Sequence, residues 1–180
     1  TIGLANAEDD KNEIPPLITK EHFNRVSTFV EEAKSLKHIE VTTGGSGIGK
    51  KGNFYKPTVI AGADYNDAIV QKEVFGPVVA IIKFEDEKKV VAMANDTNYG
   101  LAGGVWTQDI SRALRVASSI DAGYLWVNTY GGIIPETPYG GFKQSGVGKE
   151  LGSEGLEEYI RTKNISIFTG SSLPSWYGKK

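Results

Sequence analysis

The sequence contains no cysteine, one methionine and two histidines among its 180 residues. The absence of cysteine excludes disulfides, thiolate zinc sites and a cysteine nucleophile within this chain. His22 and His38 are far apart in the sequence and have no obvious partners, so we expect no histidine metal site. No apolar run approaches the length that spans a bilayer, and the N-terminus lacks a signal-peptide pattern, so we expect a cytoplasmic protein without membrane contact.

The composition is that of a folded globular protein. Apolar residues make up 39% and charged residues 23% of a chain that is long enough for one core of ordinary size. The net charge of -2 gives no reason to expect nucleic acid as a partner. Because the chain starts at Thr1 rather than Met, we expect a piece of a longer protein, although N-terminal processing would give the same start.

Hydrophobic periodicity predicts an α/β fold. We expect a helix after the candidate cap Thr19, then helices after Asp86, over 109–120 and, with Ser153 as its cap, over 154–159. We expect strands over 39–43, 54–60, 78–84, 101–106, 124–128 and 164–169. This alternation favours a mainly parallel sheet with flanking helices, in which the apolar strand 78–84 is buried on both faces. We expect residues 164–169 to form a C-terminal edge strand, residues 170–180 a tail and residues 1–17 a loop.

A glycine-rich segment over 44–52 matches two nucleotide-binding patterns in part. Gly47–Gly52 fits the dinucleotide pattern G-x-G-x-x-G, and Gly44–Lys50 nearly fits a P-loop. Lys51 replaces the Ser or Thr that a P-loop uses to reach magnesium, and Pro57 disfavours a following helix. Without a helix N-terminus the expected anion site is missing, so we interpret this segment as a flexible surface loop, with a phosphate site as the remaining alternative.

The segment Gln71–Pro77 places a carboxylate and an aromatic ring two residues apart, ahead of the apolar strand. In an extended segment, Glu73 and Phe75 point to the same face and can contact one ligand together. The carboxylate would accept hydrogen bonds from two neighbouring hydroxyls, and the ring would pack on a flat group. The alternative is a solvated Glu73 and a core Phe75 before a turn.

A second unusual segment, 129–148, is long, rich in glycine and follows the end of a predicted strand. Open α/β sheets bind ligands beyond the carboxyl ends of their strands, and long irregular segments are usually functional or disordered. The aromatic residues within it indicate a packed loop. We therefore expect part of a site here.

Several motifs occur in a family-like order. They are Glu73–Pro77, Asn98–Ala102, Trp126–Asn128, Pro138–Gly146 and Lys149–Gly152. Together they resemble the C-terminal part of the catalytic domain of the NAD(P)-dependent aldehyde dehydrogenase superfamily. The resemblance covers nearly the whole chain. Within the superfamily, the sequence looks most similar to the betaine-aldehyde and amino-aldehyde dehydrogenases.

The resemblance implies roles for five residues. Glu73 would hold the ribose hydroxyls of the nicotinamide half of the cofactor, and Phe75 would lie by the nicotinamide ring. Glu150 would be a proton-relay residue. Tyr139 and Ile133 would line the aldehyde tunnel.

The chain departs from the usual pattern at two of these motifs. Lys149 stands where arginine is more usual, which keeps the charge but loses the planar fork. Tyr139 stands where phenylalanine or tryptophan is commoner, and its ring suits a cationic substrate. The substrate aldehyde is not fixed by the sequence, and residues outside the chain decide between NAD and NADP.

In the family, a cysteine thiolate attacks the aldehyde, hydride passes to the nicotinamide, and water hydrolyses the acyl-enzyme. The nucleophile, the main base, the oxyanion asparagine and the phosphate-binding glycines all precede the part that this chain resembles. The resemblance therefore implies that residues 1–180 are a single partial domain, inactive alone and without tight NAD(P) binding. The strand 164–169 would join subunits of a dimer or tetramer. The alternative is a stand-alone binding or structural module with the same fold; a P-loop nucleotide binder is a third reading, opposed by Lys51.

Overall fold

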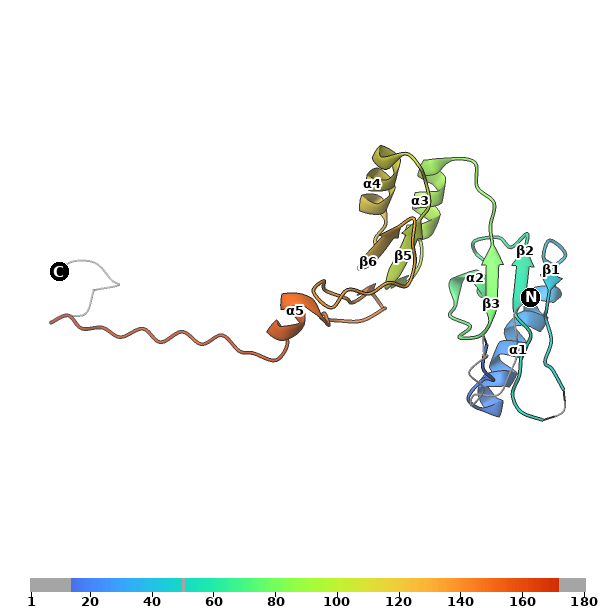
Figure 1. Cartoon of the computed structure of the whole chain (residues 1–180), viewed down its shortest axis with the longest axis horizontal. Helices are drawn as coiled ribbons and strands as arrows, with labels where there is room; N and C mark the ends of the chain where they lie inside the picture. The colour runs from blue at the N-terminus through green and yellow to red at the C-terminus, as the bar shows by residue number, and fades with distance from the viewer. Residues whose placement is uncertain (1–13, 50, 172–180) are drawn as a thin grey trace, which may run out of the picture.

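The computed structural model describes residues 14–49 and 51–171. Figure 1 shows one group of elements made of α1, α2 and β1–β3, and a second group made of α3, α4, β5 and β6. Residues 1–13 of the expected N-terminal loop and 172–180 of the expected tail lie outside the described residues.

The first helix, α1 (Lys20–Lys34), begins where the sequence predicts. The Thr19 side chain accepts a hydrogen bond from the His22 backbone N–H at 3.1 Å, which confirms Thr19 as its N-cap. The apolar stripe of the helix packs into the principal core against Ile60, and its buried members are Val26, Val30 and Ala33. Burial of this stripe fixes α1 against the first sheet.

The first sheet contains β1 (Glu40–Thr43), β2 (Thr58–Ala61) and β3 (Val78–Ile81). β2 runs antiparallel to β1 and parallel to β3, and the short helix α2 (Ala68–Gln71) lies on the connection from β2 to β3. β3 ends at Ile81, before the end of the predicted strand 78–84.

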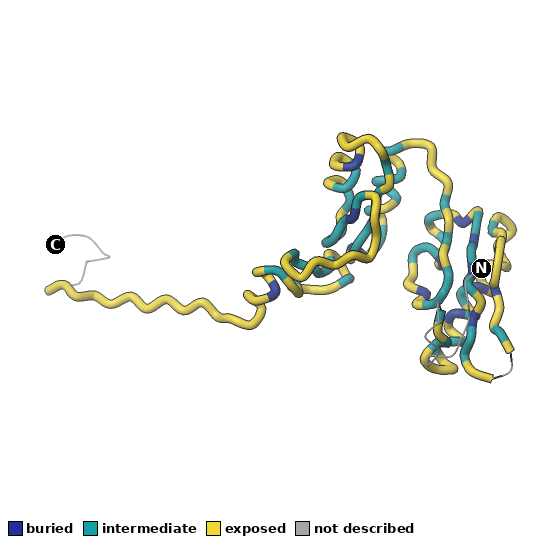
Figure 2. Tube along the Cα trace, in the orientation of Figure 1, coloured by how far each residue is buried: buried dark blue, intermediate teal, exposed yellow. Residues whose placement is uncertain are grey.

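The prediction that this strand is buried on both faces is wrong. Val79 and Ile81 are 52% and 54% exposed, whereas Val78 and Ala80 pack against the core. The described elements cover only the face that carries Val78 and Ala80, and the alternation of exposed and half-buried residues is visible along β3 in Figure 2.

The glycine-rich segment is part of a hairpin. Gly47 and Tyr55 form an antiparallel bridge, and the Ile48 N–H donates to the Phe54 carbonyl at 2.9 Å. The chain then enters β2, so no helix follows the glycines, as the sequence predicts. Both nucleotide motifs consequently lack the helix N-terminus on which they depend.

The second group of elements contains α3 (Glu87–Asn95), β5 (Ala102–Val105), α4 (Ile110–Ser119) and β6 (Tyr124–Val127). The side chains of Asp86 and Asp109 cap α3 and α4 as N-caps. Arg115 donates two hydrogen bonds to the Glu87 carboxylate, at 2.7 and 2.9 Å, and these lower the pKa of that carboxyl. This pair ties the two helices together beside the parallel pair β5–β6.

The remaining elements are β4 (Tyr99–Gly100), β7 (Phe142–Lys143) and α5 (Gly152–Glu157). β4 and β7 are antiparallel, so the strands lie in three sheets rather than in the one mainly parallel sheet that we expected. No strand of the described residues joins the parallel pairs β2–β3 and β5–β6. The predicted cap Ser153 is also wrong, because the N-cap position of α5 is Leu151, which makes no side-chain capping bond.

Beyond α5 the chain runs away from the other elements as an exposed segment (Figure 1). The predicted strand over 164–169 is not formed within this chain, because a strand needs a hydrogen-bonded neighbour and no described strand lies beside it. Pairing of this segment with another subunit stays a prediction.

Gly123, just before β6, has no room for a side chain. A Cβ at this position would lie 1.7 Å from the Gly140 carbonyl oxygen. We expect Gly123→Ala to lower the free energy of unfolding by about 1–3 kcal/mol, since the backbone must shift to relieve the clash. Urea unfolding followed by tryptophan fluorescence measures this change. Gly132→Ala is the matched control, because a Cβ there meets no atom within 4 Å; equal effects of the two substitutions would contradict the assignment.

Candidate active site

The first candidate region is the turn from α2 into β3. Phe75 has φ 54°, in the left-handed region, so the segment is not extended as the sequence analysis assumed. Phe75 is nonetheless 64% exposed and Glu73 is exposed, with the buried Val74 between them. The alternative of a core phenylalanine is therefore wrong, and both side chains are open to a ligand.

The backbone of this turn is tied to α1, which the sequence analysis missed. Arg25 Nη2 donates to the Glu73 carbonyl at 2.5 Å, and His22 Nε2 contacts the Phe75 carbonyl. The only signal in the sequence is that both donors lie three residues apart on the polar side of α1. Nothing in the sequence indicated that their acceptors lie about 50 residues later.

The second candidate region joins Tyr139 to Glu150. Each residue donates its backbone N–H to the carbonyl of the other, and both N–O distances are 2.7 Å. Residues that exchange two such hydrogen bonds lie directly opposite one another on neighbouring chain segments. The structure therefore brings together two of the five predicted site residues.

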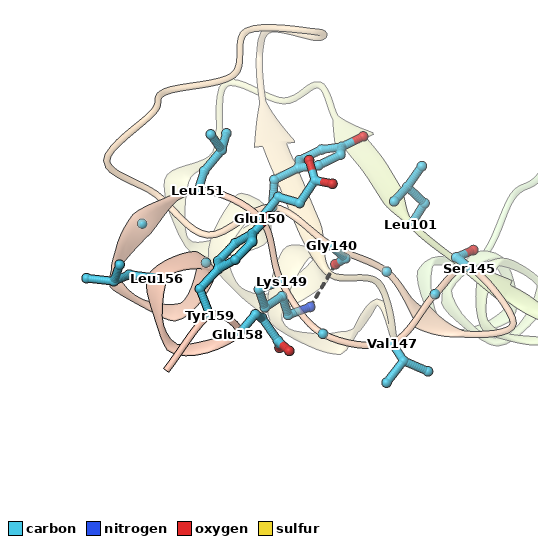
Figure 3. Close-up of a pocket in the computed structure, with 16 residues that line it drawn as sticks. Leu101, Gly140, Ser145, Val147, Lys149, Glu150, Leu151, Leu156, Glu158 and Tyr159 are labelled. Atoms are coloured by element: carbon cyan, nitrogen blue, oxygen red, sulfur yellow. Dashed lines mark hydrogen bonds between the residues drawn. The ribbon is translucent and has the colours of Figure 1, made fainter. Parts of the chain in front are cut away.

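Tyr139 and Glu150 line a cleft of about 890 Å³. Lys149 lies in the same cleft and donates to the Gly140 carbonyl at 2.7 Å, with its ammonium 4.7 Å from the centre of the Phe142 ring. Figure 3 shows the Glu150 carboxylate and the Lys149 ammonium pointing in different directions. Lys149 thus holds the loop backbone, and the Glu150 carboxylate is left exposed at the cleft.

An aromatic row extends from Tyr139 along β6. Consecutive ring centres are 5.7 Å apart from Tyr139 to Tyr124, 4.7 Å from Tyr124 to Trp126 and 4.9 Å from Trp126 to Tyr130. Trp126 Nε1 also donates to the Gly132 carbonyl at 2.6 Å, next to Ile133, which is 48% exposed. The row fixes the loop after β6, and its end residue Tyr130 is 68% exposed. The face of an aromatic ring attracts cations.

The structure does not bring all five residues into one site. Neither Glu73 nor Phe75 lines the cleft, and Ile133 does not line it either. Among residues 14–49 and 51–171, no group of three or more acidic or histidine side chains is arranged to hold a metal ion. No helix in the same ranges has the length and apolarity to cross a membrane.

A nicotinamide cofactor fits the first region in part. The exposed Glu73 carboxylate offers two acceptor oxygens for the two hydroxyls of a ribose, and the exposed Phe75 ring offers an apolar face for a flat ring. The described residues provide no helix-terminal glycine loop for the diphosphate, because Gly47 and Ile48 pair with Phe54 and Tyr55 in a hairpin. Within the described residues, the first region therefore offers groups for the nicotinamide half of a cofactor and no built site for the diphosphate.

Comparison with known proteins identifies the family. The model of the aldehyde dehydrogenase family matches residues 1–165. The chain belongs to the aldehyde dehydrogenase family. A crystal structure of betaine aldehyde dehydrogenase from Staphylococcus aureus in complex with NAD⁺ matches with a TM-score of 0.87 and 41% sequence identity. A mutant of the same enzyme in its apo form matches with the same TM-score and identity.

The match covers 95% of this chain and 35% of the Staphylococcus enzyme. The chain thus spans well under half the length of the relatives that it matches, and it contains no cysteine. The family assignment and the α/β aldehyde dehydrogenase fold are confirmed.

Proposed function

We propose that this chain supplies the C-terminal part of the catalytic domain of an NAD(P)-dependent aldehyde dehydrogenase, which oxidises an aldehyde to a carboxylic acid. The observation that carries the proposal is the match at 41% identity, over 95% of this chain, to an enzyme crystallised with NAD⁺. The exposed Glu73–Phe75 turn and the open cleft at Glu150 support it.

In this proposal the Glu73–Phe75 turn receives the nicotinamide half of the cofactor. The bound cofactor supplies the hydride acceptor of the oxidation. Glu73 accepts hydrogen bonds from the ribose hydroxyls, and Phe75 packs by the nicotinamide ring. Both side chains are exposed on either side of a buried residue, which is the presentation that these roles require.

The second region serves the substrate and its protons. Glu150, whose carboxylate lies exposed at the cleft, relays a proton, while Tyr139 and Ile133 line the path of the aldehyde. The aromatic row behind Tyr139 makes a cationic aldehyde the substrate class that this region favours.

The assembly belongs to the same proposal. The exposed segment 164–169 offers unpaired backbone groups that a strand of another subunit would satisfy. We propose a homo-oligomer in the cytoplasm in which residues 1–180 are part of one larger domain. The second candidate function is a non-catalytic module, favoured by the absence of cysteine.

The mass of the protein expressed from the native gene tests the proposal first. A mass near that of a full-length aldehyde dehydrogenase, with NAD(P)-dependent oxidation of an aldehyde, supports the enzyme. A mass that matches this chain alone, without turnover, supports the non-catalytic module.

The role of Tyr139 gives a prediction about the substrate. In the full-length enzyme, Tyr139→Leu should lower kcat/KM for betaine aldehyde by about thirtyfold, because a desolvated cation–π contact contributes on the order of 2 kcal/mol. The value for a neutral aldehyde of similar size should change much less. Steady-state kinetics with both aldehydes measure the difference, and Tyr139→Phe, which keeps the ring, is the control. A loss of the same size for both aldehydes would contradict the cationic substrate class.

A further inference from the structure

We infer that His22 and Arg25 are positioning residues that hold the Glu73–Phe75 turn in the form that receives the nicotinamide ribose. This inference rests on the proposed function, since it concerns the same turn. The inference goes beyond the proposed function because it assigns part of the control of cofactor binding to α1, about 50 residues earlier in the sequence.

The turn has a conformation that its own sequence does not favour. Phe75 adopts φ 54°, which brings the Cβ of a non-glycine residue close to its own backbone. Such a conformation persists only where surrounding contacts determine it. The next residue, Gly76, packs tightly on α1, because a Cβ there would lie 2.7 Å from a methyl carbon of Val26.

α1 supplies the contacts that hold the turn in this conformation. Arg25 Nη2 donates to the Glu73 carbonyl at 2.5 Å, and His22 Nε2 meets the Phe75 carbonyl. A carbonyl can only accept, so the His22 ring carries its proton on Nε2 in this contact. The two acceptors are the carbonyls of the two residues whose side chains we assign to the cofactor.

The arrangement separates the backbone of the turn from its side chains. Both carbonyls are taken by α1, while the Glu73 and Phe75 side chains remain exposed. The Arg25 guanidinium also lies 5.9 Å from the centre of the Phe75 ring, within the range of a cation–π contact. α1 itself is fixed by the complete burial of Val26 and Val30. Loss of either donor should therefore release the turn without unfolding the helix.

The test uses the full-length enzyme that contains this chain. We expect His22→Leu and Arg25→Met each to raise the KM for NAD⁺ by about tenfold, because a misplaced ribose acceptor loses most of one charged hydrogen bond. The KM for the aldehyde and the midpoint of thermal unfolding should stay close to those of the wild type. His22→Gln, which keeps an N–H donor, and Arg25→Lys, which keeps the charge, should recover most of the NAD⁺ affinity.

Lys20→Met is the matched control, because it also removes a cation from α1. The Lys20 ammonium lies over the Phe23 ring rather than at the turn. The inference is overturned if both variants keep the KM for NAD⁺ within about twofold of the control, or if they lower the unfolding midpoint without changing that KM. It is also overturned if the conservative variants fail to recover affinity. Failure of the proposed function is a separate result: the wild-type enzyme would then show no turnover of an aldehyde with either NAD⁺ or NADP⁺.

Discussion

The isolated 180-residue chain is expected to form no NADH from any aldehyde. The reaction of this family needs a thiolate nucleophile, and the chain has no cysteine to supply one. It also presents a ribose contact and a ring contact without a built diphosphate site in its described residues, so most of the cofactor interface is missing. Absorbance at the NADH band during incubation with NAD⁺ and aldehyde measures the activity.

The full-length enzyme under the same conditions is the control for the assay. Calorimetry adds a second readout, since the isolated chain should bind NAD⁺ weakly or not at all. NADH formation by the purified chain, or a micromolar affinity for NAD⁺, would contradict this prediction. Either result would show that the isolated chain itself supplies a nucleophile or a diphosphate site.

Glu73→Gln in the full-length enzyme is expected to slow hydride transfer by about a hundredfold. Glutamine fills the same space but replaces a carboxylate, which accepts from both ribose hydroxyls, by a group with one acceptor oxygen. Hydride transfer becomes much slower when the nicotinamide ring is no longer held at the reacting distance, because small displacements change the geometry of attack. Single-turnover kinetics with a deuterated aldehyde isolate this step, because only hydride transfer shows the isotope effect.

Glu85→Gln is a suitable control, because Glu85 is 86% exposed and lies beyond β3, away from the turn. It should leave the single-turnover rate unchanged. A Glu73→Gln enzyme with the wild-type rate and isotope effect would remove Glu73 from the cofactor site.

The sequence was most informative where the signal is local. Thr19 and Asp86 cap their helices as predicted, because a capping side chain acts on backbone N–H groups two or three residues away. The prediction that no helix follows the glycines of 44–52 is also local, because Pro57 lies within the segment that such a helix would need. These predictions needed no knowledge of the tertiary structure.

Predictions failed where the outcome depends on distant neighbours. The apolar run 78–84 indicated burial on both faces, but exposure of Val79 and Ile81 is decided by which elements pack on the sheet. The left-handed Phe75 could not be predicted from Phe75 itself, because the donors that hold it are on α1. The pairing of Tyr139 with Glu150 likewise closes a loop whose ends are not marked by periodicity.

The left-handed conformation of Phe75 has a consequence for attempts to stabilise the protein. Glycine or asparagine adopts φ 54° more readily than phenylalanine, so selection for thermal stability alone would favour replacing this residue. Either replacement would remove the ring that we assign to the nicotinamide. Position 75 is therefore a point of trade-off, where a more stable protein would be a poorer enzyme.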